Sequence, residues 1–264
     1  MKTDRHALFF DIDGTLVSFE SHEIPASTIA ALTQAKANGH QVFIATGRPI
    51  QILTNVGAIE HLVDGYITTN GAYCFVGDHV VCCNAIAQPD VETMLADSRR
   101  YDYSLVVAST TQFAVYNPHP DFDRIFVEQL AVEGLDPACM NLDKALSEPI
   151  LQFSPFFDLA HERELMPRLN GCVSGRWHPA FTDITARGTD KGHALHLMAN
   201  YLGLEQSRTV AFGDGGNDLT MIREAGIGVA MGNALPDVMM SADHITASVD
   251  DDGIMQALQQ LGLI

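Results

Sequence analysis

The sequence predicts an α/β protein whose doubly wound parallel sheet is interrupted by an inserted α+β domain. Near both ends of the chain, short apolar strands alternate with helical patterns, an order typical of parallel sheets covered by helices on both faces. Several of these strands run directly into glycine and polar residues, which a parallel sheet gathers at its carboxyl edge. With 264 residues, 47% of them hydrophobic, the chain can form one large domain or two.

The predicted elements of the core follow in order along the chain. A short apolar strand leads from His6 to Asp11. Residues 25–38 are predicted to form a helix that begins at a proline and stops at Gly39. Residues 41–45 form the next buried strand, and one further strand precedes the insert. After the insert, the expected order is helix, strand, helix, strand and helix.

The insert, residues 83–185, carries its own series of helices and strands and is large enough to be a separate domain. Its predicted helices span residues 90–100, 121–133 and 161–169. Its predicted strands span residues 104–108, 113–116, 150–157, 172–177 and 181–185. The core is therefore expected to consist of two parts, residues 1–82 and residues 186–264.

The first strand ends in Phe-Phe-Asp-Ile-Asp-Gly-Thr-Leu, which places Asp11 and Asp13 one residue apart. In an extended segment such residues face the same side, so the two carboxylates are expected to share one pocket. They would repel each other by about 4 kcal/mol at an effective dielectric constant near 20, which calls for a cation or a shared proton. An EF-hand is excluded because Leu16 and His22 stand at its sixth and twelfth positions. An ordinary Asp-Gly turn remains the alternative.

Residues 210–219, Val-Ala-Phe-Gly-Asp-Gly-Gly-Asn-Asp-Leu, form another apolar strand that runs into glycines and carboxylates. A dinucleotide-binding fingerprint would need a glycine where Asp218 stands. Carboxylates instead suit magnesium, which takes oxygen ligands and can in turn hold a phosphate. Two weaker signals are the phosphate donors Thr-Gly-Arg after the strand at 42–45 and Lys191 at a predicted helix start.

Together and in this order, the four segments resemble the signature of the haloacid dehalogenase superfamily. Asp-Ile-Asp-Gly-Thr-Leu is similar to its first motif, Ala-Thr-Gly-Arg to its second, Lys191 to its third and Gly-Asp-Gly-Gly-Asn-Asp to its fourth. The form of the fourth motif, the segment 70–72 and the long insert resemble the Cof-type sugar-phosphatase branch, as does the tail 242–254. The resemblance implies a Rossmann-like core with the insert as a large α+β cap over the catalytic face.

The resemblance also implies a reaction, the magnesium-dependent hydrolysis of a small phosphorylated metabolite through an aspartyl-phosphate intermediate. Asp11 would be the nucleophile, and Asp13 would protonate the leaving alcohol and then deprotonate the attacking water. Thr46 and the Gly47 amide would hold the transferred phosphoryl group. Lys191 would neutralise the charge shared by the nucleophile and the substrate.

For the magnesium ion, the resemblance implies ligands from carboxylates of both halves of the core. The expected set is Asp11, the backbone carbonyl of Asp13, Asp214, and Asp218 through a metal-bound water. Asn217 would act on the phosphate side of the site. Arg48 would either reach the substrate phosphate or brace its own motif.

Specificity is expected to reside in the cap, because a lid that closes over a catalytic face excludes water and supplies contacts. The expected contacts are Trp177, His178 and Asp183. Trp177 would either stack on the organic part of the substrate or pack between cap and core. Asp183 stands where the family usually carries glutamate, which puts the contact to sugar hydroxyls in doubt. His193 and His196 have a spacing compatible with a metal, with a surface pair on one helix as the alternative.

Charge and composition limit the partners of this protein. The chain has 15 basic and 33 acidic residues and a net charge of −18, which argues against nucleic acids and anionic membranes. No apolar run approaches the ~20 residues of a membrane span, and no signal-peptide pattern is present. We therefore expect a cytoplasmic protein without an obligatory protein partner. The five cysteines, an odd number without a Cys-x-x-Cys pair, favour neither a zinc site nor a disulfide scaffold.

Two other functions remain open. A phosphotransferase of the phosphomannomutase type has nearly the same motifs, and dependence on a sugar bisphosphate would distinguish it. A non-catalytic phospho-switch similar to a receiver domain also uses an acidic pocket, a threonine and a lysine, but such a domain has neither a cap nor a counterpart of Asp13. If the protein is a phosphatase, sugar phosphates are the first expected substrates, and phosphorylated cofactors such as pyridoxal or flavin phosphate come next.

Overall fold

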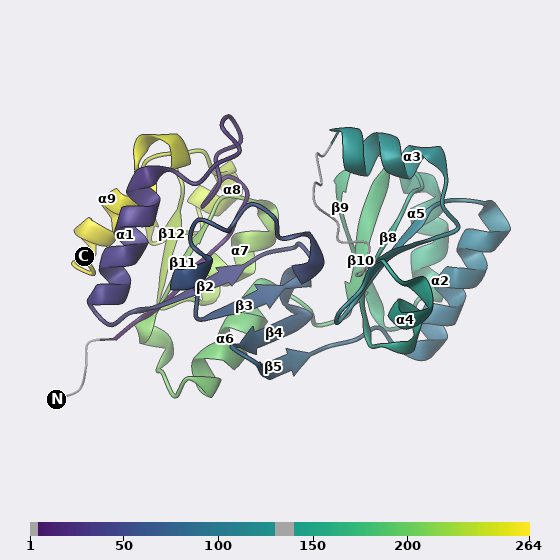
Figure 1. Cartoon of the computed structure of the whole chain (residues 1–264), viewed down its shortest axis with the longest axis horizontal. Helices are drawn as coiled ribbons and strands as arrows, with labels where there is room; N and C mark the ends of the chain where they lie inside the picture. The colour runs from purple at the N-terminus through teal and green to yellow at the C-terminus, as the bar shows by residue number, and fades with distance from the viewer. Residues whose placement is uncertain (1–4, 130–139) are drawn as a thin grey trace. The chain divides into compact units, whose positions relative to one another are not determined.

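The structure is a computed structural model that describes residues 5–129 and 140–264, and its contacts divide the chain into two compact units (Figure 1). The first unit comprises the chain up to Gly47 together with Asn55–Cys82 and Asp190–Ile264. The second comprises Arg48–Thr54 and Cys83–Thr189. The sequence placed the return to the core at residue 186 and assigned the segment 48–54 to the core, so both points differ from the division by contacts.

The first unit is built on an eight-stranded sheet, in the order β13-β12-β11-β1-β2-β3-β4-β5. All neighbours from β13 to β3 pair in parallel, and β4 is antiparallel to β3. This confirms the predicted doubly wound sheet, whereas the antiparallel hairpin β4–β5 at its edge was not predicted. The strands are β1 (Ala7–Phe10), β2 (Gln41–Ala45), β3 (Gly65–Thr68), β4 (Tyr73–Val76), β5 (His79–Cys83), β11 (Thr209–Gly213), β12 (Ile227–Ala230) and β13 (His244–Ile245).

Helices cover both faces of this sheet, which is why its central strands are continuously apolar. One face carries α6 and α7, whose apolar side chains share a core cluster with Phe9 and Phe43. On the other face α1 and α9 pack side by side (Figure 1). The ring of Phe9 stacks on Phe43 at 4.9 Å, and that of Phe10 on Phe212 at 4.6 Å. The helices are α1 (Ala26–Ala37), α6 (Lys191–Tyr201), α7 (Leu219–Glu224), α8 (Pro236–Met239) and α9 (Gly253–Gln260).

The second unit has an antiparallel sheet of five strands in the order β7-β6-β8-β10-β9, with an apolar cluster on each face. The predicted strands of the insert are confirmed, with shifted ends. Its strands are β6 (Leu105–Ser109), β7 (Phe113–Tyr116), β8 (Ile150–Pro155), β9 (Cys172–His178) and β10 (Phe181–Ala186). Its helices are α2 (Gln88–Tyr101), α3 (Pro120–Phe122), the π-helical η4 (Asp123–Gln129), α4 (Leu142–Ser147) and α5 (Leu159–Leu165).

The helix predicted at 121–133 is instead the short α3 followed by the π-helix η4, and the last four residues of the predicted helix lie outside the described part of the chain.

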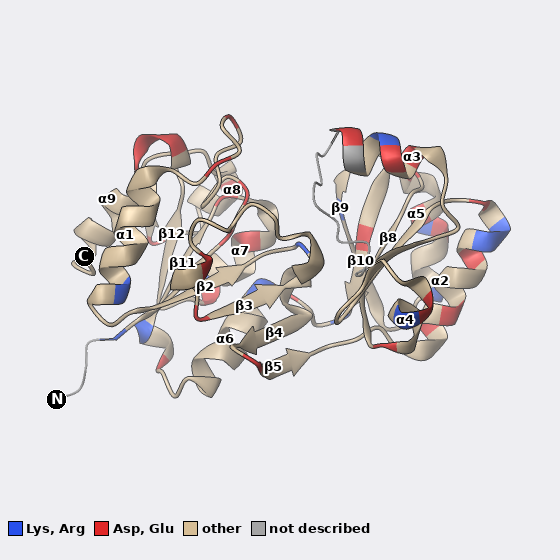
Figure 2. Ribbon diagram, in the orientation of Figure 1, with Lys and Arg blue, Asp and Glu red and all other residues tan. Residues whose placement is uncertain are grey.

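Acidic side chains are spread over both units and outnumber the basic ones (Figure 2). Within the described residues, no helix combines the length and the apolar character needed to cross a membrane.

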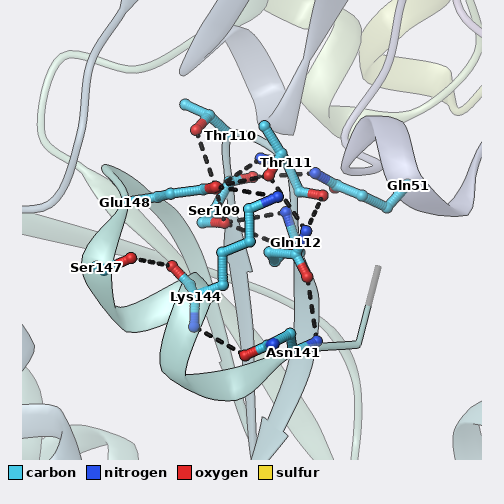
Figure 3. A network of polar contacts seen from close by, with 9 residues as sticks. All are labelled: Gln51, Ser109, Thr110, Thr111, Gln112, Asn141, Lys144, Ser147 and Glu148. Atoms are coloured by element: carbon cyan, nitrogen blue, oxygen red, sulfur yellow. Dashed lines mark hydrogen bonds and ion pairs between the residues drawn. The ribbon is translucent and has the colours of Figure 1, made fainter. Parts of the chain in front are cut away.

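The segment 48–54 groups with the second unit because of two kinds of contact. Ile52 packs into the apolar cluster around Phe113, and Gln51 Nε2 donates to the backbone oxygen of Ser109 at 3.2 Å. The turn after Ser109 is itself fixed by Glu148. Its carboxylate accepts hydrogen bonds from the Ser109 hydroxyl at 2.7 Å and from two hydroxyls and one backbone amide in the turn (Figure 3). The chain therefore passes into the second unit directly after Gly47.

Candidate active site

Three carboxylates and one lysine meet at the carboxyl edge of the large sheet. Asp11 follows β1 and Asp214 follows β11, and these strands are parallel neighbours with Phe10 opposite Phe212. Their carboxyl ends therefore bring the two side chains to the same place. Asp218, in the turn before α7, completes a group in which one oxygen of each carboxylate lies within 4.8 Å of the others.

Lys191 is the cation of this group. It is the first residue of α6, its side chain is fully buried, and Nζ donates to Asp11 Oδ1 and to Asp218 Oδ1, each at 2.6 Å. Burial alone would lower the pKa of Lys191, but the negative charges of the two carboxylates and their hydrogen bonds outweigh burial and raise it. Lys191 is therefore protonated at neutral pH and holds the Asp11 carboxylate in a fixed orientation.

One lysine does not balance three buried carboxylates. Burial raises the pKa of Asp11 well above its usual value, the charge of Asp218 raises it further, and Lys191 opposes both effects. Burial and the charge of Asp218 likewise raise the pKa of Asp214 to about 7. The hydrogen bond that the Thr15 hydroxyl donates to Asp214 Oδ1 at 2.9 Å acts in the opposite direction and lowers this pKa. The excess of negative charge is the electrostatic condition that a divalent cation relieves.

The hydrogen bonds separate the carboxylates into two kinds. Asp218 Oδ2 accepts from the amides of Asp214 and Gly215 at 3.0 and 2.9 Å, and its other oxygen accepts from Lys191. In contrast, Asp11 and Asp214 each accept a single-donor contact on Oδ1, from the Lys191 ammonium and from the Thr15 hydroxyl. Because Mg²⁺ prefers oxygen ligands, Asp11 and Asp214 fit it as direct ligands and Asp218 fits as the group that holds the site together.

The turn that contains Asp13 lies against the same group. Gly14 adopts φ +84°, and a Cβ there would come within 2.3 Å of Asp214 Oδ2, so the turn requires glycine. Asn233 fixes the turn from outside by donating to the Gly14 backbone oxygen at 2.8 Å. The charge of Asp13 adds to the rise in the pKa of Asp214, as expected for a neighbouring carboxylate.

A second turn, Thr69–Gly71, brings Asn70 to the site, a residue not predicted to belong to it. The backbone N–H of Asn70 donates to the backbone oxygen of Thr46 at 3.0 Å, and the side-chain Oδ1 of Asn70 accepts from Asn217 Nδ2 at 3.1 Å. Gly47 also lies close to Asn70, since a Cβ added to Gly47 would be 3.0 Å from Asn70 Oδ1. Three residues predicted to bind phosphate therefore lie next to Asn70, namely Thr46, Gly47 and Asn217. Asn70 has φ +54°, a left-handed conformation that asparagine tolerates better than most residues.

The predicted specificity residues are in the second unit, on β9 and β10. The Trp177 side chain is 60% exposed, and its Nε1 donates to Asp183 Oδ2 at 2.8 Å. Ser154 donates to the other oxygen of Asp183 at 2.6 Å. These hydrogen bonds lower the pKa of Asp183, but burial outweighs them and raises it. The His178 ring stacks on Phe181 with the ring centroids 4.9 Å apart. Trp177, His178 and Asp183 therefore form one cluster.

The other predicted residues are Arg48 and the two histidines of α6. Arg48 is half-buried at the start of the segment that groups with the second unit. His196 Nε2 lies 2.7 Å from a carboxylate oxygen of Glu224 on α7. Neither His193 nor His196 belongs to the acidic group that could hold a metal in the described part of the chain, and the surface pair on one helix is the interpretation that fits.

The sequence matches the family of haloacid dehalogenase-like hydrolases over residues 8–258. YkrA of Bacillus subtilis (strain 168) is 31% identical over 277 residues, an alignment that covers 99% of this chain and 99% of YkrA. YitU of the same organism, named 5-amino-6-(5-phospho-D-ribitylamino)uracil phosphatase, is 26% identical over 275 residues. That alignment covers 98% of this chain and 98% of YitU.

Two solved structures show the same arrangement of the chain. The structure of a HAD subclass IIB sugar phosphatase superposes with a TM-score of 0.86 at 43% identity, covering 98% of this chain and 100% of that one. A phosphatase of the same superfamily from Bacteroides thetaiotaomicron gives a TM-score of 0.85 at 34% identity, and the match covers 98% of this chain and 96% of that one. Since the match extends over nearly the whole sequence and its first, third and fourth motifs meet in one acidic group, this chain belongs to the haloacid dehalogenase superfamily, in its Cof-type branch, and is a phosphatase.

Proposed function

We propose that this phosphatase depends on magnesium and hydrolyses a small phosphorylated metabolite of the sugar phosphate class through an aspartyl-phosphate intermediate. The observation that carries the proposal is the buried group of Asp11, Asp214 and Asp218 around one lysine, Lys191. The excess negative charge of this group suits a divalent cation. Asp11, at the end of β1, is held in place by the hydrogen bond from Lys191, as a nucleophile must be. The sugar phosphatase with 43% identity supports the substrate class.

Each of these residues has a defined part in the proposed reaction. Asp11 attacks phosphorus while Asp13 gives a proton to the leaving alcohol, and Asp13 then removes a proton from the water that cleaves the aspartyl-phosphate. Thr46 and the Gly47 amide hold the phosphoryl oxygens, and Lys191 offsets their charge. A magnesium ion would be held by Asp11, Asp214 and the backbone carbonyl of Asp13, and it would supply further positive charge for phosphoryl transfer.

For the organic part of the substrate, we propose the cluster on β8, β9 and β10. The exposed indole of Trp177 offers a flat apolar surface for a sugar ring. Asp183 and Ser154 offer polar groups next to it, and Gln152 Oε1 is buried and has no hydrogen-bond partner within the part of the chain that the structure describes. A sugar hydroxyl group would satisfy the Gln152 oxygen, whereas a purely aromatic ligand would leave that oxygen unpaired.

Chelation of divalent metal should abolish turnover, and the pH should control how tightly magnesium binds. Asp214 has a pKa of about 7 in the metal-free protein, so magnesium must displace a proton below that pH. The protonated form favours folding: this contribution is complete below the usual pKa of 3.8 and is lost as the pH rises through about 7. Magnesium should therefore raise the melting temperature more at about pH 8 than at about pH 6.

The measurement is a thermal unfolding series with and without magnesium, paired with an assay of released phosphate. Asp214→Asn should lose both the magnesium effect and its pH dependence, whereas Asp78→Asn, an exposed carboxylate at the tip of the β4–β5 hairpin, should keep them. Calcium should restore activity poorly because it prefers more ligands in a looser shell. Full activity after exhaustive chelation would show that the proposed metal dependence is wrong.

Trp177→Ala should reduce kcat/KM about tenfold for the best sugar phosphate, equivalent to ~1.4 kcal/mol, and leave p-nitrophenyl phosphate nearly unchanged. Contacts remote from phosphorus help only a substrate that can make them. Trp177→Phe keeps the apolar surface and removes the hydrogen bond to Asp183, so it should lose less. Equal losses for both substrates, with an unchanged circular dichroism spectrum, would assign Trp177 to packing.

A further inference from the structure

Trp177 and His178 are neighbours in the chain, yet their rings contact the same phenylalanine. Successive side chains of a regular strand point to opposite faces of its sheet. The ring centroids of Trp177 and of His178 nevertheless each lie 4.9 Å from that of Phe181. Trp177 Nε1 also donates to Asp183, which is on the same strand as Phe181. The regular alternation of side chains must therefore be interrupted in β9.

The interruption is a β-bulge between the neighbouring strands β9 and β10 (Figure 1). Gly175 of β9 pairs with Asp183 of β10. The next pair joins His178 to Phe181, so β9 contributes two residues between the pairs and β10 only one. Such a bulge re-aims the side chains of its strand. It explains how Trp177 and His178 come to face the same ring.

Arg176 lies in this bulge, and its guanidinium group binds backbone oxygens of two chain segments. Nη1 donates to the oxygens of His178 and Pro179 at 3.2 and 3.0 Å. Nη2 donates to the oxygen of Phe157, which follows β8, at 3.1 Å. A guanidinium group offers five donors in a rigid plane. One side chain therefore ties the end of β9 and the turn after it to the segment that follows β8.

Arg176 is itself fixed by helix α5. Its Nε donates to Oε2 of Glu162 on α5 at 2.5 Å, and only 15% of its side chain is exposed. The two apolar clusters on the sheet distinguish its faces, because Leu165 of α5 belongs to one cluster and Phe181 to the other. Arg176 is therefore held on the face that α5 covers, while Trp177 contacts Phe181 on the opposite face.

We propose that Arg176 is a positioning residue for substrate recognition, because it holds the bulge that presents Trp177 next to Asp183. The inference rests on the proposed function, which assigns the organic part of the substrate to the cluster on β8, β9 and β10. Arg176 acts through the backbone of the turn and not by contact with the substrate. A lysine in its place can keep the positive charge near Glu162, but a single ammonium group does not reproduce the planar set of donors. Arg176→Lys should therefore release the turn.

Trp177 is the only tryptophan of the chain, so its fluorescence reports on its position without any substrate. The test measures how strongly acrylamide quenches this fluorescence in the whole protein, with circular dichroism to check the fold. Arg176→Lys should raise the quenching constant, because a released Trp177 loses its contact with Phe181 and its hydrogen bond to Asp183. Arg176→Gln takes the place of the lysine variant if that variant unfolds.

Arg187→Ala is the matched control. It removes a hydrogen bond of 3.2 Å from an arginine to a backbone oxygen, that of Cys172, at the other end of β9. The quenching constant of this variant should stay at the wild-type value. An unchanged constant in Arg176→Lys, or an equal rise in Arg187→Ala, would overturn the inference.

Kinetic constants test whether Arg176 acts through Trp177. Arg176→Lys should raise KM for the best sugar phosphate about fivefold, change kcat less than about twofold, and leave p-nitrophenyl phosphate nearly unaffected. In a Trp177→Ala background, the same substitution should cause no further loss, because its effect passes through the indole. Losses that add, or an unchanged KM for the sugar phosphate, would overturn the inference. If the protein hydrolyses no sugar phosphate, the proposed function fails by itself, and the quenching comparison still decides whether Arg176 positions Trp177.

Discussion

Asp11→Asn should reduce turnover by about four orders of magnitude or more and should form no phosphoenzyme, because the amide lacks the charge needed for attack on phosphorus. The substitution keeps an oxygen that can accept the hydrogen bond from Lys191, now 2.6 Å long, so the fold should be retained. It also removes one of three buried negative charges, which should make the metal-free protein more stable at neutral pH.

Asp13→Asn should behave differently, because Asp13 moves protons and does not bond to phosphorus. We expect a loss of about 10²–10⁴-fold, the usual contribution of a positioned general acid and base. With an activated ester, whose leaving group needs no proton, the aspartyl-phosphate should form and accumulate. Intact mass and peptide mapping should place the added phosphoryl group on Asp11. A phosphoryl group on any other residue, or near wild-type turnover in Asp11→Asn, would contradict the assignment.

Lys191→Met should have the second largest effect, on activity and stability together. The side chain is fully buried between Asp11 and Asp218, so its removal leaves carboxylates without their hydrogen-bonded cation. Breaking a buried ion pair in this way costs about 3–5 kcal/mol of unfolding free energy. Turnover should fall equally for sugar phosphates and p-nitrophenyl phosphate, because both substrates share the phosphate that Lys191 serves.

The matched control is Lys36→Met, which removes another lysine 2.6 Å from an aspartate in the same unit. The Lys36–Asp64 pair is partly exposed, with 28% and 24% of the side chains accessible, so its loss should cost at most about 1 kcal/mol. Denaturant unfolding without magnesium compares the two variants. A Lys191→Met protein as stable as Lys36→Met would mean that the carboxylates at the site are already protonated, against the assignment of Lys191 as their cation.

The sequence alone determined the parallel part of the large sheet, the alternation of its strands and helices, and the family. These features are encoded locally: the apolar run before Asp11 has no polar residue that could face water, and the helix 26–37 lies between a proline and a glycine. The first and fourth motifs could also be placed at one edge, because the strands before them were predicted to be parallel and the carboxyl ends of parallel strands meet.

Only the tertiary structure decided how the charges are shared. Lys191 and Asp11 are 180 positions apart, and Lys191 and Asp218 are 27 apart, so no local pattern could show that one lysine bridges both. The same holds for Asn70, which reaches Asn217 across 147 positions. Hydrogen bonds and pKa values depend on distances within a few ångströms and on burial, and long-range packing sets both.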